Sequence, residues 1–126
     1  MNNKHPIRKF TELKAWQHGH QLVLGVYGAT KAFPQQELFG LSSQLQRAAV
    51  SITSNIAEGF SRQTAADKIH FYHMSLGSCS EVQNQLLVAR DIHILDSESF
   101  DSLSELSVTT HKLTNGMIRA LRERQA

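Results

Sequence analysis

Residues 41–59, with the sequence LSSQLQRAAVSITSNIAEG, decide the fold of this 126-residue chain. Their apolar side chains recur every three or four positions, which places them on one face of a helix: Leu41, Leu45, Ala48, Ile52 and Ile56. Ser42 is the candidate N-cap, and Gly59 is the candidate C-cap. The segment therefore predicts an amphipathic helix over residues 42–59.

Upstream, the same spacing predicts a helix over residues 11–32, with Thr11 as its N-cap. This helix has two adjacent apolar seams. One comprises Leu13, Trp16, His20, Val23, Tyr27 and Thr30, and the other comprises Ala15, Gly19, Leu22, Val26, Ala29 and Phe33. Phe33 precedes Pro34, and a residue before proline is pushed away from the helical region, so the helix should stop there.

Downstream, two more helices are predicted over residues 65–91 and 97–123. Thr64 is the candidate N-cap of the first, and a turn around Asp96 and Ser97 opens the second. The seam of the first contains Ile69, Tyr72, Leu76, Cys79, Gln83 and Leu86. The seam of the second contains Phe100, Leu103, Leu106, Thr110, Leu113, Met117 and Ala120.

Four helices of similar length with short connections are typical of an all-α, antiparallel up-down-up-down four-helix bundle. Strand signals are absent, and we expect a single domain over residues 1–126 with flexible ends at 1–9 and 124–126. Five glycines fall inside the predicted helices, where each costs about 1 kcal/mol relative to alanine. Some of them are expected to permit close helix contacts, and others to be tolerated weaknesses: Gly19, Gly25, Gly28, Gly77 and Gly116.

Composition narrows the class of protein. Charged residues make up 19% of the chain, below the roughly 25% typical of soluble domains. The net charge is only +2, and this low value excludes intrinsic disorder, which goes with high net charge. The single cysteine, Cys79, excludes an internal disulfide and indicates a reducing compartment. The apolar run at residues 22–29 follows basic residues and crudely imitates a secretory signal, but helical spacing begins upstream of it and continues beyond it. A membrane span needs about 20 apolar residues, so we predict a cytoplasmic protein that does not enter a membrane.

The search for catalytic or metal chemistry yields no site. His70 and His73 lie one turn from Asp67, but the Glu-x-x-His motifs of a bundle metal site are absent, so neither a metal nor a cofactor is predicted. Cys79 falls on a core seam, where a thiol is an inert small hydrophobe. A nucleophile elbow, a phosphate loop and a dinucleotide motif are also absent, so we predict no catalytic residues and no enzyme activity.

The polar residues Asn55 and Glu58, near the end of the helix predicted over residues 42–59, are interpreted as structural. A carboxylate at this end opposes the negative end of the helix dipole, so Glu58 needs a partner. Arg62, one turn on, or a backbone amide of the following loop would supply it.

The charges separate along the predicted bundle. One end, the basic pole, collects nine basic residues: Lys4, Arg8, Lys9, Lys14, Arg62, Lys68, Arg119, Arg122 and Arg124. Four acidic residues accompany them and leave a net charge of +5: Glu12, Glu58, Asp67 and Glu123. The other end, the acidic pole, has a net charge of −3 from Lys31, Arg90, Glu37, Asp91, Asp96, Glu98 and Asp101. The waist between the poles sums to zero with Arg47, Lys112, Glu81 and Glu105.

Long stretches of two helices have no formally charged residue, namely residues 15–30 and 48–57. A bundle helix normally shows a charged face to water. Uncharged polar residues could solvate these stretches instead, but burial against another subunit explains them better. The pattern therefore predicts a homo-oligomer.

Residues 44–62, QLQRAAVSITSNIAEGFSR, resemble the signature of a bacterial family, the proteins encoded in intervening sequences of 23S ribosomal RNA genes. Its most specific part is Asn55-Ile56-Ala57-Glu58-Gly59, and the resemblance extends over about residues 8–122. It implies a four-helix bundle that assembles into a homopentameric ring. A related branch, the accessory variability protein of diversity-generating retroelements, binds nucleic acid and a reverse transcriptase, which makes both of these possible partners.

Charge and resemblance together give a functional hypothesis. In a ring of parallel subunits all basic poles share one face, and five copies would carry about +25 there, enough to attract an RNA or DNA backbone without sequence specificity. Two alternatives stay open. The basic ends could merely solubilise the chain, or the oligomer could be a scaffold that docks a protein partner through its acidic pole or rim.

Overall fold

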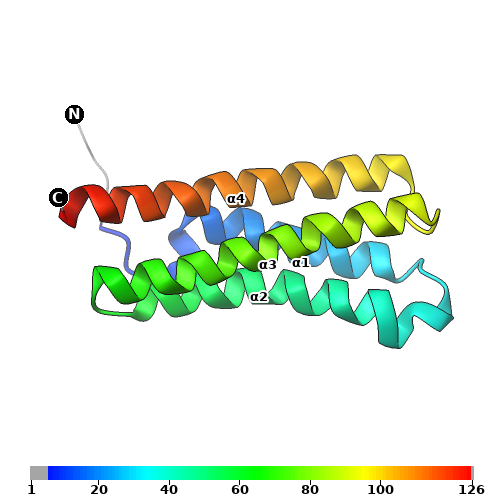
Figure 1. Ribbon diagram of the computed structural model, residues 1–126, viewed down its shortest axis with the longest axis horizontal. Coiled ribbons are helices and arrows are strands. Elements are labelled where there is room, and N and C mark those ends of the chain that lie inside the picture. Colours follow the sequence, from blue (N-terminus) through cyan, green and yellow to red (C-terminus); the bar gives the residue numbers. More distant parts are fainter. Residues whose placement is uncertain (1–5, 126) are drawn as a thin grey trace.

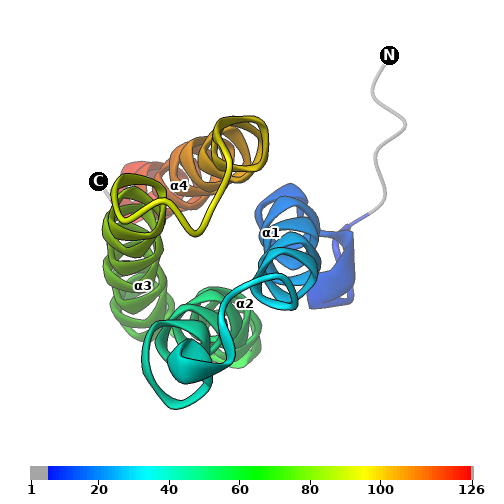
Figure 2. The same ribbon diagram turned by 90° about the vertical axis from the view of Figure 1, so that its right-hand side faces the viewer.

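The computed structural model describes residues 6–125, which contain four antiparallel α-helices and no strand (Figure 1). The helices are α1 (Lys14–Thr30), α2 (Ser43–Ser61), α3 (Ala65–Asp91) and α4 (Ser97–Gln125). Viewed along the bundle they follow one another around a square, so that α1 lies diagonally opposite α3 (Figure 2). The predicted up-down-up-down four-helix bundle is therefore confirmed.

The start of α1 differs from the prediction. Phe10–Glu12 form a 3-10 turn, η1, and Leu13 rather than Thr11 is the N-cap, so the Thr11 prediction is wrong. The Glu12 carboxylate stabilises this turn because it accepts hydrogen bonds from the backbone N–H groups of Arg8 (2.8 Å) and Lys9 (3.3 Å). The Phe10 ring packs edge-on against Trp16, with 5.5 Å between ring centroids.

The start of α2 is also irregular. A 3-10 turn, η2 (Gln35–Glu37), leads into a π-helical turn, η3 (Leu38–Ser42), in which Gly40 has non-helical backbone angles. Ser42 occupies the predicted N-cap position but has helical angles and makes no capping hydrogen bond, because η3 already supplies a preceding turn.

The end of α2 corrects the C-cap prediction. The helix continues past Gly59 to Ser61, and Arg62 is the C-cap. Gly59 is buried, and a Cβ atom at this position would lie 2.6 Å from Cε1 of Tyr72. This glycine therefore lets α3 approach α2 closely rather than ending the helix.

The ends of α3 and α4 follow the sequence more closely. Thr64 caps α3, since its hydroxyl accepts a hydrogen bond from the N–H of Asp67 at 3.1 Å. The predicted turn before α4 is also present, and the Asp96 carboxylate accepts from the N–H of Ser99 at 2.7 Å. Both N-caps satisfy backbone donors that a helix start leaves unpaired.

The core is apolar but contains hydroxyl groups. Of the two seams predicted on α1, the one with Leu22 and Val26 is buried except for the half-buried Ala29, whereas most of the other is only half-buried. On α3 the predicted seam residues Tyr72, Cys79 and Leu86 are buried, but Ser75 and Val82 are buried in place of their neighbours Leu76 and Gln83. Ser75 is accommodated because its hydroxyl donates to the carbonyl of Ile52 at 2.9 Å. No helix in residues 6–125 combines the length and apolarity needed to cross a membrane.

Candidate nucleic-acid interface

The antiparallel topology brings the start of α1, the α2–α3 turn and the end of α4 to one end of the bundle (Figure 1). Of the nine residues predicted to form the basic pole, eight lie at this end: Arg8, Lys9, Lys14, Arg62, Lys68, Arg119, Arg122 and Arg124. Lys4 lies outside the described residues. The four acidic residues expected there leave a net charge of +4 for the described part of this pole.

Two of these cations are held by the turn between α2 and α3. Arg62 forms an ion pair with Glu58, with 2.7 Å between Nη2 and Oε2, and its guanidinium lies 4.6 Å from the centroid of the Phe71 ring. The predicted Glu58–Arg62 pair is therefore confirmed. Lys68 donates from Nζ to the carbonyl oxygen of Phe60 at 2.7 Å. These contacts fix the two positive charges but also occupy part of their hydrogen-bonding capacity.

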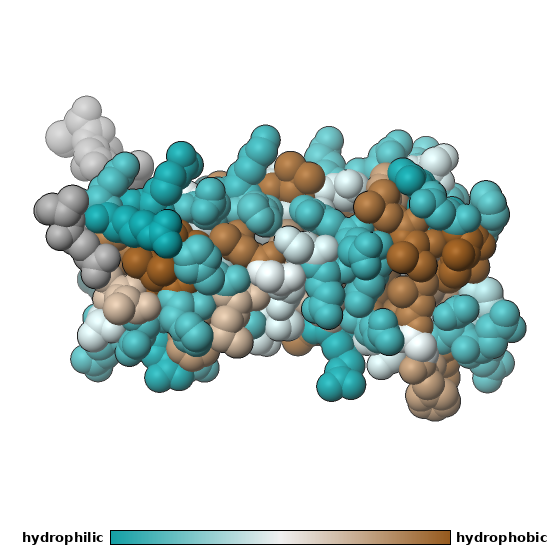
Figure 3. Space-filling model, viewed as in Figure 1, coloured by the Kyte–Doolittle hydropathy of each residue, from teal (hydrophilic) through white to brown (hydrophobic). Residues whose placement is uncertain are grey.

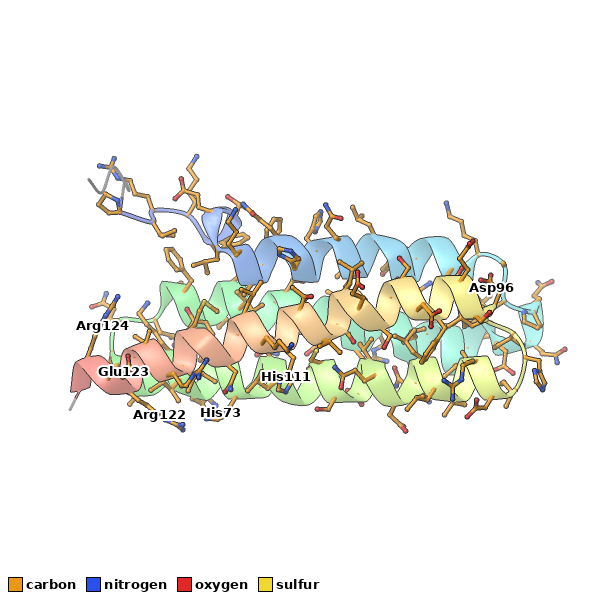
Figure 4. All side chains as sticks on the ribbon, turned by 90° about the horizontal axis from the view of Figure 1, so that it is seen from above. His73, Asp96, His111, Arg122, Glu123 and Arg124 are labelled. Carbon is orange, nitrogen blue, oxygen red and sulfur yellow. The ribbon has the colours of Figure 1, made fainter. Side chains whose placement is uncertain are left out.

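The last turns of α4 carry three arginines. Arg122 donates from Nη2 to Nε2 of His73 on α3 at 3.1 Å, since a guanidinium has no acceptor. Arg124 projects from the other side of α4 (Figure 4). Within residues 6–125, the side chains of Lys14, Arg119 and Arg124 make no hydrogen bond or ion pair. These three are therefore among the cations available to a phosphate.

Sequence reasoning missed a cavity at this pole. It has a volume of about 350 Å³, and we call it the pole pocket; it is lined by Ile7, Leu13, Phe60, Lys68, Tyr72, Met117, Ala120, Leu121 and Arg124. Its lining comes from the segment before α1 and from α2, α3 and α4. The one signal in the sequence is Gly59, which predicts a helix end but in the structure makes room for the Tyr72 ring.

The opposite end matches the predicted acidic pole. It contains the connection between α1 and α2 and the turn between α3 and α4. Arg90 forms an ion pair there with Asp91, with 2.9 Å between Nε and Oδ1. Its guanidinium lies 4.5 Å from the centroid of the Phe100 ring. The separation of charge is thus a property of the folded monomer.

The groups with altered acidity indicate structure rather than catalysis. Burial raises the pKa of the Cys79 thiol to about 11, and Sγ donates to the carbonyl of Ser107 at 3.1 Å. The thiol therefore stays protonated near neutral pH and is a poor nucleophile.

The predicted structural role of Asn55 agrees with its hydrogen bonds from Nδ2 to the carbonyl and hydroxyl oxygens of Ser51. In the described part of the chain, no three His, Cys, Asp or Glu side chains come together as a metal site.

The described residues form a four-helix bundle with one basic end, which places the chain in the class of small all-α bundle proteins. The family model of the 23S rRNA-intervening sequence protein matches residues 11–116, and the chain belongs to this family. The predicted resemblance is therefore confirmed.

A solved structure supports the fold. It is a protein with unknown function from the S23 ribosomal protein family of Bacteroides thetaiotaomicron, to which the chain is similar with a TM-score of 0.77 and 22% identity. The likeness covers 83% of this chain and 95% of the other. At this identity it establishes the fold alone. The chain has no match among curated proteins.

Proposed function

We propose that the chain forms a homo-oligomeric ring, for which the family resemblance favours five copies, and that the ring binds RNA or DNA through its basic poles. The observation that carries the proposal is that two features occur on the same bundle. One is a set of uncharged, partly apolar outer faces, and the other is a basic pole with unpaired cations. The first feature favours assembly, and the second favours a polyanionic ligand.

The outer face of α1 supports assembly. Leu24 is 60% exposed and Tyr27 is 43% exposed, on a helix without formal charge from residue 15 to residue 30. A Cβ atom built on Gly28 would have no neighbour within 4 Å, whereas one on Gly25 would lie 2.5 Å from Cδ2 of Leu103. Gly25 thus serves packing within the bundle. Close approach of a second copy would explain Gly28, which otherwise only weakens its helix.

The diagonally opposite helix offers a second apolar surface. Its exposed apolar side chains are Met74, Leu87 and Val88, and Ile92, the C-cap residue, follows them. An apolar patch near the acidic pole, between the end of α3 and the start of α2, is visible in Figure 3. Because α1 and α3 lie on opposite sides (Figure 2), contact between α1 of one copy and α3 of the next would be heterologous. Contacts of this type generate a ring if the rotation closes.

A parallel ring would gather the basic poles on one face. Lys14, Arg119 and Arg124 have no partner within residues 6–125, so they could contact phosphates without first breaking an ion pair. Such contacts position a nucleic acid but read no sequence. The affinity should therefore be similar for many sequences and should fall steeply as the salt concentration rises.

Light scattering coupled to gel filtration tests assembly. A pentamer would have a mass of about 70 kDa, whereas a species of 14.1 kDa would contradict the ring. Leu24→Glu should dissociate the oligomer without loss of helical circular dichroism, because it places a charge on the uncharged outer face. The matched control is Asn115→Glu, which adds the same charge to an exposed position of α4 near Lys112 and Arg119.

Filter binding of structured RNA and DNA at low salt tests the ligand. The triple charge reversal Arg119→Glu, Arg122→Glu and Arg124→Glu should abolish retention. The matched control reverses three exposed cations outside the basic pole: Lys31→Glu, Arg47→Glu and Lys112→Glu. Equal loss in both triple variants would mean that total charge, rather than the pole, governs binding. No retention of wild-type complexes would refute nucleic-acid binding.

One observation favours a protein-docking scaffold as the second candidate. Leu38 is 50% exposed and Phe39 is 93% exposed at the acidic pole. Large apolar side chains in this position are typical of a surface that meets another protein. Partner binding that survives nuclease and high salt, and that is lost in Phe39→Ser, would support the scaffold function in place of the nucleic-acid function.

A further inference from the structure

The floor of the pole pocket is a buried aromatic side chain with an unused polar group. Tyr72 is only 3% exposed, and its ring packs against Gly59, which has no side chain to block it. Burial raises the pKa of the phenol, so it stays protonated. Its hydroxyl makes no hydrogen bond within residues 6–125 and is therefore free to donate to, or accept from, a group that enters the pocket.

The walls are apolar and the rim is positive. Leu13, Phe60, Met117 and Leu121 contribute apolar surface, while Lys68 and Arg124 contribute charge. Lys68 Nζ is held 2.7 Å from the Phe60 carbonyl oxygen and 5.3 Å from the centroid of the Phe60 ring, and it has two further N–H donors. The rim therefore complements an anion whose uncharged part fits into an apolar cavity.

The position of the pocket favours one kind of anion. Two other cations of the basic pole, Lys14 and Arg119, make no ion pair within residues 6–125 and could hold the neighbouring phosphates of a polymer. A flat nucleobase has apolar faces and a polar edge, which match the apolar walls and the Tyr72 hydroxyl. In a duplex the bases are stacked and paired, so only an unpaired base could enter.

We propose that the pole pocket receives the base of an unpaired nucleotide whose phosphate lies on Lys68 and Arg124. This inference rests on the proposed nucleic-acid function and adds to it a preference for single strands. It also assigns a role to Gly59 of the Asn-Ile-Ala-Glu-Gly segment, since a larger residue there would displace the pocket floor.

Fluorescence anisotropy with three labelled probes of equal phosphate number tests the proposal: a single strand, the same strand with abasic sites, and a duplex. Base stacking on aromatic side chains is worth enough to give about a tenfold higher affinity for the intact single strand than for the abasic strand. Equal affinity for the intact and abasic strands would overturn this inference alone. Absence of binding to all three probes at low salt would overturn the proposed nucleic-acid function as well.

A variant that fills the pocket without altering charge sharpens the test. Ala120→Trp should lower the affinity for the intact single strand to that of the abasic strand and leave duplex binding unchanged. The matched control, Ala66→Trp, is an exposed position at the same pole outside the pocket lining, and it should behave like wild type. Equal effects of the two variants would contradict the pocket. Saturable binding of decanoate that is lost in Ala120→Trp, with no preference for the intact strand, would show that the occupant is an aliphatic anion.

Discussion

The two ends of α2 are built in different ways. At the basic pole Gly59 is packed against Tyr72, Glu58 is paired with Arg62, and Thr64 caps the next helix. At the acidic pole the helix is entered through a 3-10 turn and a π-helical turn without a side-chain cap, and Phe39 is 93% exposed. Contacts within the chain therefore explain the first end, whereas the second leaves apolar surface that nothing in residues 6–125 covers.

The largest effect is expected at the basic pole. Gly59→Ala would place a methyl group 2.6 Å and 2.9 Å from two atoms of the Tyr72 ring. Overpacking of this kind costs about 1–3 kcal/mol, and a buried ring pressed between helices cannot move aside easily. We therefore expect the free energy of unfolding, measured in urea, to fall by about 2–3 kcal/mol.

Gly77→Ala is the control for this variant. A Cβ atom there would have no neighbour within 4 Å, so the substitution should not destabilise the isolated subunit and should stabilise it by up to about 1 kcal/mol. If Gly59→Ala were as stable as Gly77→Ala, the close packing of α2 on α3 at the basic pole would be refuted.

A smaller effect is expected from the α3 cap. Thr64→Ala removes the hydroxyl that accepts from the N–H of Asp67, and loss of such a cap costs about 1 kcal/mol. Thermal unfolding would detect the change. Thr64→Ser retains the acceptor and should stay close to wild type, so equal losses in both variants would contradict the capping role.

The sequence predicted elements well where apolar spacing and capping chemistry agree. Both agree at the start of α3, where Thr64 caps the helix as predicted. Prediction was wrong where a residue has two uses. Gly59 is typical of a helix end, but its lack of a side chain serves packing against a residue 13 positions later, which no local pattern reveals.

Buried hydroxyl groups limited the prediction of the core. Thr114 is 1% exposed and Ser107 is fully buried, although neither is apolar. Their hydroxyls donate to backbone carbonyls of their own helix, at 2.8 Å to Thr110 and 2.7 Å to Ser104, so their burial leaves no donor unpaired. Hydrophobic spacing alone cannot distinguish such residues from solvent-facing ones.

For the candidate site, the sequence located the basic pole because topology alone decides which helix ends meet. It could not predict the pole pocket, whose lining combines residues from Ile7 to Arg124 and depends on the depth at which Tyr72 packs. Nor could it distinguish the occupied cations, such as Arg62, from unpaired ones such as Arg119. Those distinctions depend on side-chain distances.

At the acidic pole a pH-dependent effect is expected from Asp96. The backbone N–H of Ser99, followed by its hydroxyl, lowers the pKa of this carboxyl from its ordinary value of 3.8. A pKa that is lower in the folded state gives stability that is present above pH 3.8 and is lost as the pH falls through the folded-state pKa. Wild type should therefore be more stable than Asp96→Asn at pH 6, and the difference should vanish as acidification protonates the carboxyl.

Thermal unfolding at a series of pH values would measure this difference. Asn can still accept the hydrogen bond from Ser99, so the comparison isolates the charge at the N-terminus of α4. Asp101→Asn removes the same charge from an exposed position of the same helix and is the matched control for the change in net charge. A pH-independent loss in Asp96→Asn would instead indicate damage to the cap.

The smallest effect on stability is expected at Phe39. This residue also separates the two ends of α2 most clearly. Its side chain is 93% exposed, and substitutions on an open surface change stability by about 0.5 kcal/mol or less. Phe39→Ser should therefore unfold at the same urea concentration as wild type. A large loss of stability would mean that η3 depends on the Phe39 side chain and that the acidic pole is as tightly packed as the basic pole. An unchanged urea midpoint together with a change in oligomeric mass or partner binding would mean that the Phe39 side chain contacts another molecule, as the exposed end of α2 predicts.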